Sequence, residues 1–74
     1  MSPEKMITMA NQIATFFATQ PDQDRAERAA NHINDFWEPR MRLQLLAHLR
    51  NGGAGLHELI KSAQPLITAP ATER

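Results

Sequence analysis

The chain has 74 residues, no cysteine, and eight basic against eight acidic side chains, so its formal net charge is zero. A single domain of this length buries only about 60% of the surface that it exposes when unfolded, which leaves a marginal core that a partner protein would support. The lack of cysteine excludes disulfides, thiolate metal sites and cysteine nucleophiles, and it favours a reducing cytoplasm. The balanced charge provides no long-range field for a polyanion, so nucleic acid is not an expected partner.

The stretch from Met6 to Ala18 is the only candidate for a targeting segment. Polar residues interrupt this stretch, and the acidic Glu4 beside Lys5 is unlike the positively charged start of a signal peptide. We therefore expect no signal peptide, no membrane span and a cytoplasmic location.

A first helix is predicted from about residue 3 to residue 19. Ser2 can cap it, and Pro3 suits the first turn because the missing N–H would have no partner there. Gln20 and Pro21 end the helix, since the residue before a proline is pushed out of the α region. Its apolar side chains spread over roughly 200° of the helical wheel, which is more than a small helical domain usually covers.

A second helix is predicted from about residue 22 to residue 37, with Asp22 as its cap. Apolar side chains recur at intervals of three and four residues and fill an arc of roughly 120°, which is the width of one core-facing stripe. These residues are Ala26, Ala29, Ala30, Ile33, Phe36 and Trp37. We expect this helix to bury its apolar face within its own domain.

A third helix is predicted from about residue 39 to residue 51, because Pro39 is suited to a first helical position and Gly52 and Gly53 favour a stop. Its apolar side chains spread over roughly 240° of the wheel, and Arg42 falls inside that arc. A guanidinium cannot be buried alone. Arg42 must therefore reach solvent, pair with an acid of its own chain, or bind a carboxylate or carbonyl of another protein.

A short fourth helix is predicted from about residue 56 to residue 64, and residues 65–74 read as an extended or disordered tail. No stretch alternates with period two, so the predicted fold is all-α: one domain over residues 1–64, built as a small bundle of three main helices plus the short fourth helix. Two interpretations of the wide apolar arcs stay open. Either another protein covers the excess, or the fourth helix and the tail cover the first or the third helix.

Metal and catalytic sites find little support in the sequence. His32 and Asp35 could supply two metal ligands on one helix, with His48 or His57 as a third, but no recognised metal-binding spacing is present. The glycine-rich run at residues 51–55 lacks the strand and the lysine of a phosphate-binding loop. No serine or threonine stands with a histidine and an acid in a convincing triad. We predict no catalytic, cofactor-binding or metal-binding residue in this chain.

An alternative function is a small helical DNA-binding or regulatory module. Three short helices could form a helix-turn-helix with Arg40 and Arg42 near the start of the recognition helix. That helix is mostly leucine, whereas base readout needs polar side chains on the face that enters the groove.

Several short motifs resemble one family. They are MANQI at residues 9–13, FF at 16–17, HI at 32–33, FWEPRMR at 36–42 and GGAGL at 52–56. Over about residues 3–63 the chain resembles the delta subunit of the cytoplasmic NAD-dependent formate dehydrogenases.

The resemblance implies an accessory role without a redox centre in this chain. In that family the alpha subunit oxidises formate at a bis-molybdopterin guanine dinucleotide (bis-MGD) cofactor with molybdenum or tungsten. The partner subunits, beta and gamma, hold the iron–sulfur clusters and the FMN that lead to NAD. The delta subunit is associated with assembly, stability or cofactor loading of the complex. The expected partner is therefore the alpha subunit, within a complex that also holds beta and gamma.

We expect the partner interface to centre on the proline corner between the second and third helices, because aromatic residues and arginine dominate interface energetics. The predicted interface residues are Phe36, Trp37, Pro39, Arg40, Met41 and Arg42, together with Asn11 and Phe17. Of these, Phe36 should serve mainly the core, Trp37 and Met41 should contribute to both core and interface, and Arg42 is the hardest to explain without a partner.

Overall fold

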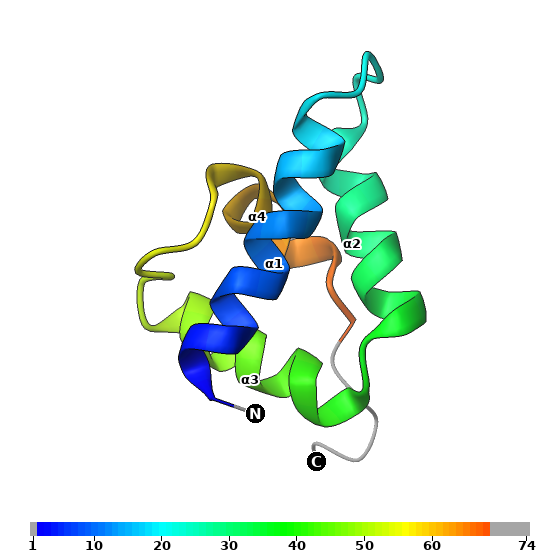
Figure 1. Cartoon of the computed structure of the whole chain (residues 1–74). Helices are drawn as coiled ribbons and strands as arrows, with labels where there is room; N and C mark the ends of the chain where they lie inside the picture. The colour runs from blue at the N-terminus through cyan, green and yellow to red at the C-terminus, as the bar shows by residue number, and fades with distance from the viewer. Residues whose placement is uncertain (1, 69–74) are drawn as a thin grey trace.

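The computed structural model of the chain describes residues 2–68 and contains only helices and connecting turns within them (Figure 1). The elements are α1 (Pro3–Ala18), α2 (Arg25–Phe36), α3 (Pro39–Arg50), α4 (Glu58–Ala63) and a short 3₁₀ helix, η1 (Gln64–Leu66). The predicted all-α fold is confirmed. Helices α1 and α2 lie side by side, and α3 crosses their lower end (Figure 1).

Two of the predicted helix starts are present. The side chain of Ser2 accepts a hydrogen bond from the Lys5 amide at 3.2 Å, which caps α1. Glu38 is extended, with ψ of 153°, and Pro39 is the first residue of α3. Both starts were predictable because each depends on a proline and its immediate neighbours.

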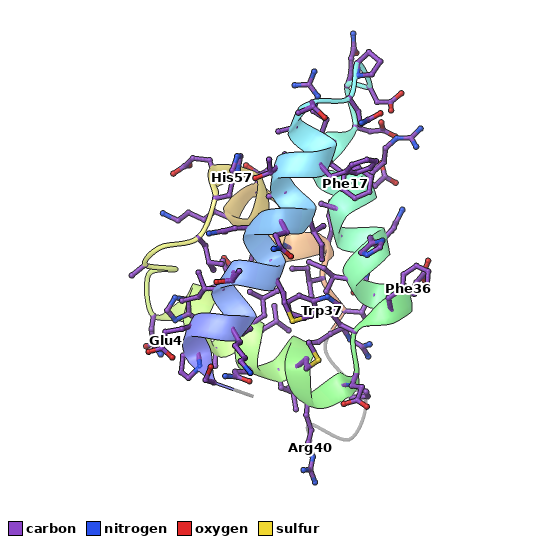
Figure 2. The ribbon with its side chains drawn as sticks, in the orientation of Figure 1. Glu4, Phe17, Phe36, Trp37, Arg40 and His57 are labelled. Atoms are coloured by element: carbon purple, nitrogen blue, oxygen red, sulfur yellow. The ribbon has the colours of Figure 1, made fainter. Side chains whose placement is uncertain are left out.

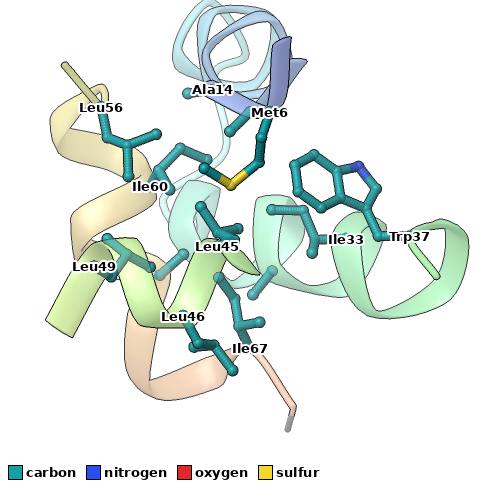
Figure 3. Packing of buried hydrophobic residues seen from close by; sticks show 13 residues of the cluster. Met6, Ala14, Ile33, Trp37, Leu45, Leu46, Leu49, Leu56, Ile60 and Ile67 are labelled. Atoms are coloured by element: carbon teal, nitrogen blue, oxygen red, sulfur yellow. The ribbon is translucent and has the colours of Figure 1, made fainter. Parts of the chain in front are cut away.

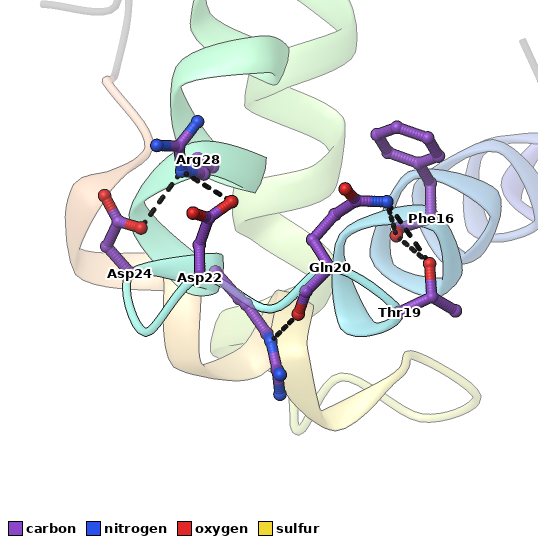
Figure 4. Close-up of polar contacts among 7 residues, drawn as sticks. Phe16, Thr19, Gln20, Asp22, Asp24 and Arg28 are labelled. Atoms are coloured by element: carbon purple, nitrogen blue, oxygen red, sulfur yellow. Dashed lines mark hydrogen bonds and ion pairs between the residues drawn. The ribbon is translucent and has the colours of Figure 1, made fainter.

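The start of α2 differs from the prediction. The helix begins at Arg25, and the residue at its N-cap is Asp24 rather than Asp22. Both carboxylates instead meet the Nε atom of Arg28, at 3.0 Å from Asp24 and 3.4 Å from Asp22 (Figure 4). The hydrogen bond from Arg28 lowers the pKa of Asp24. Arg25 donates to the Gln20 carbonyl at 2.7 Å, which holds the turn against the end of α1.

The loop after α3 also shifts the start of α4, from the predicted residue 56 to Glu58. Gly53 and Gly55 have φ values of +65° and +81°, a region that side chains disfavour. The loop turns Leu56 into the core, where it is 6% exposed. His57 then caps α4, because its Nδ1 atom accepts a hydrogen bond from the Leu59 amide at 2.9 Å.

One core joins every helix (Figure 3). It consists of Met6, Ala10, Ala14, Ala30, Ile33, Trp37, Leu45, Leu46, Leu49, Leu56, Ile60, Ala63 and Ile67. Three of its four alanines, Ala10, Ala14 and Ala30, lie on α1 and α2, where small side chains allow the two helices to approach closely. The larger side chains of α3 and α4 fill the remaining space.

The segment after α4 belongs to the fold where an extended tail was predicted. Residues 64–66 form η1, and Ile67 is buried in the core with 6% exposure. Pro65 does not prevent this, because a proline is tolerated in the first turn of a helix. The remainder of the predicted tail, residues 69–74, lies outside the described residues.

The core contacts distinguish α1 from α3, the two helices whose apolar arcs are wide for a small domain. Leu45, Leu46 and Leu49 of α3 are buried in the core that α4 and Ile67 complete, so the chain itself covers α3. Helix α1 instead keeps large apolar side chains in solvent, with Phe16 59% exposed and Met9 36% exposed. Of these two helices, α1 is therefore the one that keeps excess apolar surface, and Phe36 of α2 and Leu66 of η1 add to it elsewhere.

Candidate protein-docking face

An apolar groove of about 460 Å³ runs between α1 and α2. It is lined by Met9, Gln12, Ile13, Phe16, Phe17, His32, Phe36 and Trp37. Met9, Ile13 and Phe16 follow one another at intervals of four and three residues, so they lie along one side of α1. We call this feature the α1–α2 groove.

Phe36 stands at the edge of this groove and is 73% exposed, so the expectation that it serves mainly the core is wrong. Helix α2 ends at Phe36, and Trp37 turns inward to a position that is 6% exposed (Figure 2). Trp37 follows the buried Ile33 by four residues and continues its inward-facing row. Phe36 is left on the outer side of the last turn.

A row of ring contacts connects the two sides of the groove. Phe16 and Phe17 meet edge to face with centroids 5.1 Å apart, Phe17 lies 6.2 Å from the ring of His32, and His32 lies 4.8 Å from Phe36. Such contacts are worth about 0.5–1.5 kcal/mol each beyond burial for aromatic pairs. They hold the exposed rings in place within the isolated chain.

The α1 side of the groove carries no formal charge. The sequence has no Asp, Glu, Lys or Arg from residue 6 to residue 21. The exposed side chains of α1 after Lys5 are Thr8, Met9, Gln12, Thr15 and Phe16. About 25–35% of a well-behaved soluble surface consists of charged residues, whereas the centres of protein interfaces are depleted of charge and enriched in aromatic residues and methionine. This face has the composition of an interface centre.

Arg42 has hydrogen-bond partners within its own chain, so no partner protein is needed to explain its position, and its contact with a partner stays a prediction. Its Nη1 atom donates to the carbonyls of Trp37 at 2.8 Å and Asn34 at 3.3 Å, and its Nε atom donates to the carbonyl of Thr68 at 3.1 Å. The last carbonyls of a helix have no partner within that helix. Arg42 satisfies two of these carbonyls at the end of α2 and binds the chain beyond η1.

Asn11 also has an internal role. Its side-chain amide donates to the Gly55 carbonyl at 2.9 Å and accepts from the His57 amide at 2.8 Å. Asn11 therefore fastens the loop before α4 to α1, and its place in a partner interface stays a prediction.

The remaining predicted interface residues fall in three places. Phe17, Phe36 and Trp37 line the α1–α2 groove, and Trp37 does so while nearly buried. Pro39 and Arg40 are exposed at the start of α3, where the Arg40 side chain points away from the domain (Figure 2). Met41 is half-buried against the core.

Sequence reasoning missed five of the residues that line the groove: Met9, Gln12, Ile13, Phe16 and His32. A signal for the first four was present, because they lie within the uncharged run from residue 6 to residue 21. His32 was weighed as a metal ligand, and its ring instead lies between two phenylalanine rings, edge to face with Phe17 and tilted against Phe36.

The histidines considered as metal ligands are not gathered in one place. Among residues 2–68, no group of three histidine or acidic side chains is arranged to hold a metal ion. The Nε2 atom of His48 lies 2.7 Å from the Ala54 carbonyl, and His57 caps α4. In the same part of the chain, no helix combines the length and the apolar character needed to cross a membrane.

Fold and surface together define a small all-α protein with a preformed, uncharged apolar face. The family model of the NADH-dependent formate dehydrogenase delta subunit FdsD matches residues 5–64. The chain belongs to this family, which confirms the resemblance noted in its sequence motifs. No curated protein matched the chain.

Proposed function

We propose that this chain is a non-catalytic accessory subunit of an NADH-dependent formate dehydrogenase, and that it binds the catalytic alpha subunit in the cytoplasm. In this role it supports assembly, stability or cofactor loading of the complex. The molybdenum or tungsten cofactor, the iron–sulfur clusters, FMN and NAD belong to the other subunits in this proposal. The chain has no cysteine with which to hold a cluster of its own.

The observation that carries the proposal is the α1–α2 groove, with two phenylalanine rings largely in solvent at its edges. Burying a large apolar side chain contributes about 1.5–3 kcal/mol, so covering Phe16 and Phe36 would stabilise a complex by roughly 2–4 kcal/mol, given that both are already partly covered. A permanent minor subunit gains this energy throughout its lifetime. A free monomer does not.

The DNA-binding alternative loses one of its two proposed phosphate contacts. Arg42 is bound to three carbonyls of its own chain and is not available to a phosphate. Arg40 alone is exposed at the start of α3.

Co-expression tests the proposal directly. A tagged form of this chain, expressed with the alpha, beta and gamma subunits, should retain them through affinity purification and gel filtration. Loss of all three subunits from the tagged chain would contradict the proposal. The complex made without this chain then separates the roles: low molybdenum or tungsten content indicates cofactor loading, and normal metal content in a complex that dissociates easily indicates scaffolding.

A further inference from the structure

We infer that the α1–α2 groove receives one amphipathic helix of the alpha subunit, which presents an uncharged apolar stripe about two turns long. This inference rests on the proposed function, and it specifies how the contact is made. The relevant features are the length of the groove, the hydrogen bonding of its walls and the distribution of charge around it.

The length of the groove matches two helical turns. Met9 and Phe16 mark its ends on α1, and seven residues at 1.5 Å per residue separate them by about 10 Å. A helix that lies along the groove would present apolar side chains at positions i, i+3 or i+4, and i+7 over the same distance. The spacing of Met9, Ile13 and Phe16 is the complement of that pattern.

The walls of the groove favour a helix over an extended peptide. An extended segment exposes backbone N–H and C=O groups that need partners when they leave water. The walls are sides of α1 and α2, where helical hydrogen bonds already engage the backbone, and the polar side chains of the lining are Gln12 and His32. A helix satisfies its own backbone and so can lie against such walls without that cost.

Charge around the groove selects the same kind of occupant. The lining contains no Asp, Glu, Lys or Arg, so a charged side chain entering the groove would lose water without gaining a counter-ion. The inner face of the occupant must therefore be uncharged. Beyond the Trp37 end, Glu38 and Arg40 are both exposed and carry opposite charges, so this flank favours neither sign of charge at the adjoining end of the partner helix.

Photo-crosslinking in the intact complex identifies the occupant. A benzophenone amino acid at position 16, in the complex of all four subunits, should crosslink to an alpha-subunit peptide with apolar residues at i, i+3 or i+4, and i+7. A crosslink only to beta, to gamma or to a second copy of this chain would overturn the inference. So would a crosslinked alpha-subunit peptide without that spacing.

Paired variants test how much the side chains of the groove contribute to binding of the alpha subunit. Phe16→Glu and Phe36→Ser should each weaken retention of the alpha subunit by about 30-fold, as expected for central interface residues. Leu66→Glu is the matched control, because Leu66 is an apolar side chain 47% exposed outside the groove, and it should leave retention unchanged. Circular dichroism and the urea midpoint of each isolated variant confirm that it is folded.

The two proposals fail in different ways. If the unmodified chain does not retain the alpha subunit, the proposed function is wrong. If the unmodified chain retains it and both groove variants, folded as the unmodified chain is, retain it equally well, the function stands and the groove is not the contact.

Discussion

Asn11 and Asn34 each make the same pair of hydrogen bonds to the backbone. Asn11 binds the segment before α4, and Asn34 binds the segment at the end of η1. The Asn11 amide donates to the Gly55 carbonyl and accepts from the His57 N–H, at 2.9 and 2.8 Å. The Asn34 amide donates to the Leu66 carbonyl and accepts from the Thr68 N–H, at 3.0 and 2.8 Å. Each side chain thus binds the backbone of residues two apart, and the two together fasten the C-terminal third of the fold to α1 and α2.

Removing one of these amides should weaken the isolated chain. We expect Asn34→Ala to lower the free energy of unfolding by about 1–2 kcal/mol, because two hydrogen bonds are lost at a partly solvated site. Urea unfolding followed by circular dichroism measures the change. Asn31→Ala, at an exposed position of the same helix, is the control and should change stability by less than about 0.5 kcal/mol. Equal effects of the two substitutions would show that the Asn34 contacts contribute nothing.

Arg42 should behave as a stability residue. Arg42→Ala leaves carbonyls of Asn34, Trp37 and Thr68 without their donor, and we expect a loss of about 2–3 kcal/mol in the free energy of unfolding. Arg42→Lys should recover only part of it, since one ammonium cannot reproduce the planar fork of donors. Urea unfolding of the isolated chain measures both losses.

Arg40→Ala is the matched substitution for Arg42→Ala, because Arg40 is exposed on the same helix. It should change the stability of the isolated chain by less than about 0.5 kcal/mol. An isolated Arg42→Ala chain as stable as the wild type, combined with loss of the complex, would restore the interpretation of Arg42 as a partner contact.

The loop before α4 depends on the backbone conformation of Gly53. Its φ of +65° disfavours any side chain, and an added Cβ would lie 3.4 Å from both the Leu49 and the Lys61 side chains. We expect Gly53→Ala to cost about 1–2 kcal/mol, the penalty for a left-handed residue. Gly53→Asn should cost less, because asparagine tolerates this region better, and thermal unfolding ranks the two. A Gly53→Ala chain with the melting temperature of the wild type would contradict the loop geometry.

The α1–α2 turn predicts a small acid sensitivity. Because the hydrogen bond from Arg28 lowers the pKa of Asp24, the charged carboxylate stabilises the folded state above its unfolded pKa. That contribution is lost as the pH falls from the ordinary value of 3.8 through the lower folded pKa. NMR titration of the carboxyl carbon should show the lowered pKa in the wild type and its return toward the ordinary value in Arg28→Ala. An unchanged titration in that variant would rule out the pairing.

Local signals explain which parts of the fold could be predicted. The start of α1 at Ser2 and Pro3, the start of α3 at Pro39 and the stop near Gly52 each depend on a few adjacent residues. The start of α2 could not be predicted as safely, because Asp22 and Asp24 are equivalent as caps in the sequence. Arg28, one turn further along, engages both.

The errors at the proline corner have a different cause. A helical wheel treats Phe36 and Trp37 as one stripe, but the helix ends between them, and only Trp37 turns inward. The partners of Arg42 are carbonyls that become available where α2 stops and where residue 68 returns to the fold. The residues around Arg42 in the sequence predict neither the end of α2 nor the return of residue 68 to the fold. Five of the residues that line the α1–α2 groove, in contrast, lie within a run of sixteen uncharged residues, from 6 to 21, in a chain of balanced charge.

We propose that this chain binds the catalytic alpha subunit through the α1–α2 groove. The most direct test is affinity purification of the tagged chain after co-expression with the alpha, beta and gamma subunits one at a time. We expect the alpha subunit alone to be retained by the wild type and to be lost with Phe16→Glu. Retention of beta or gamma in place of alpha, or of alpha equally by both forms, would contradict it.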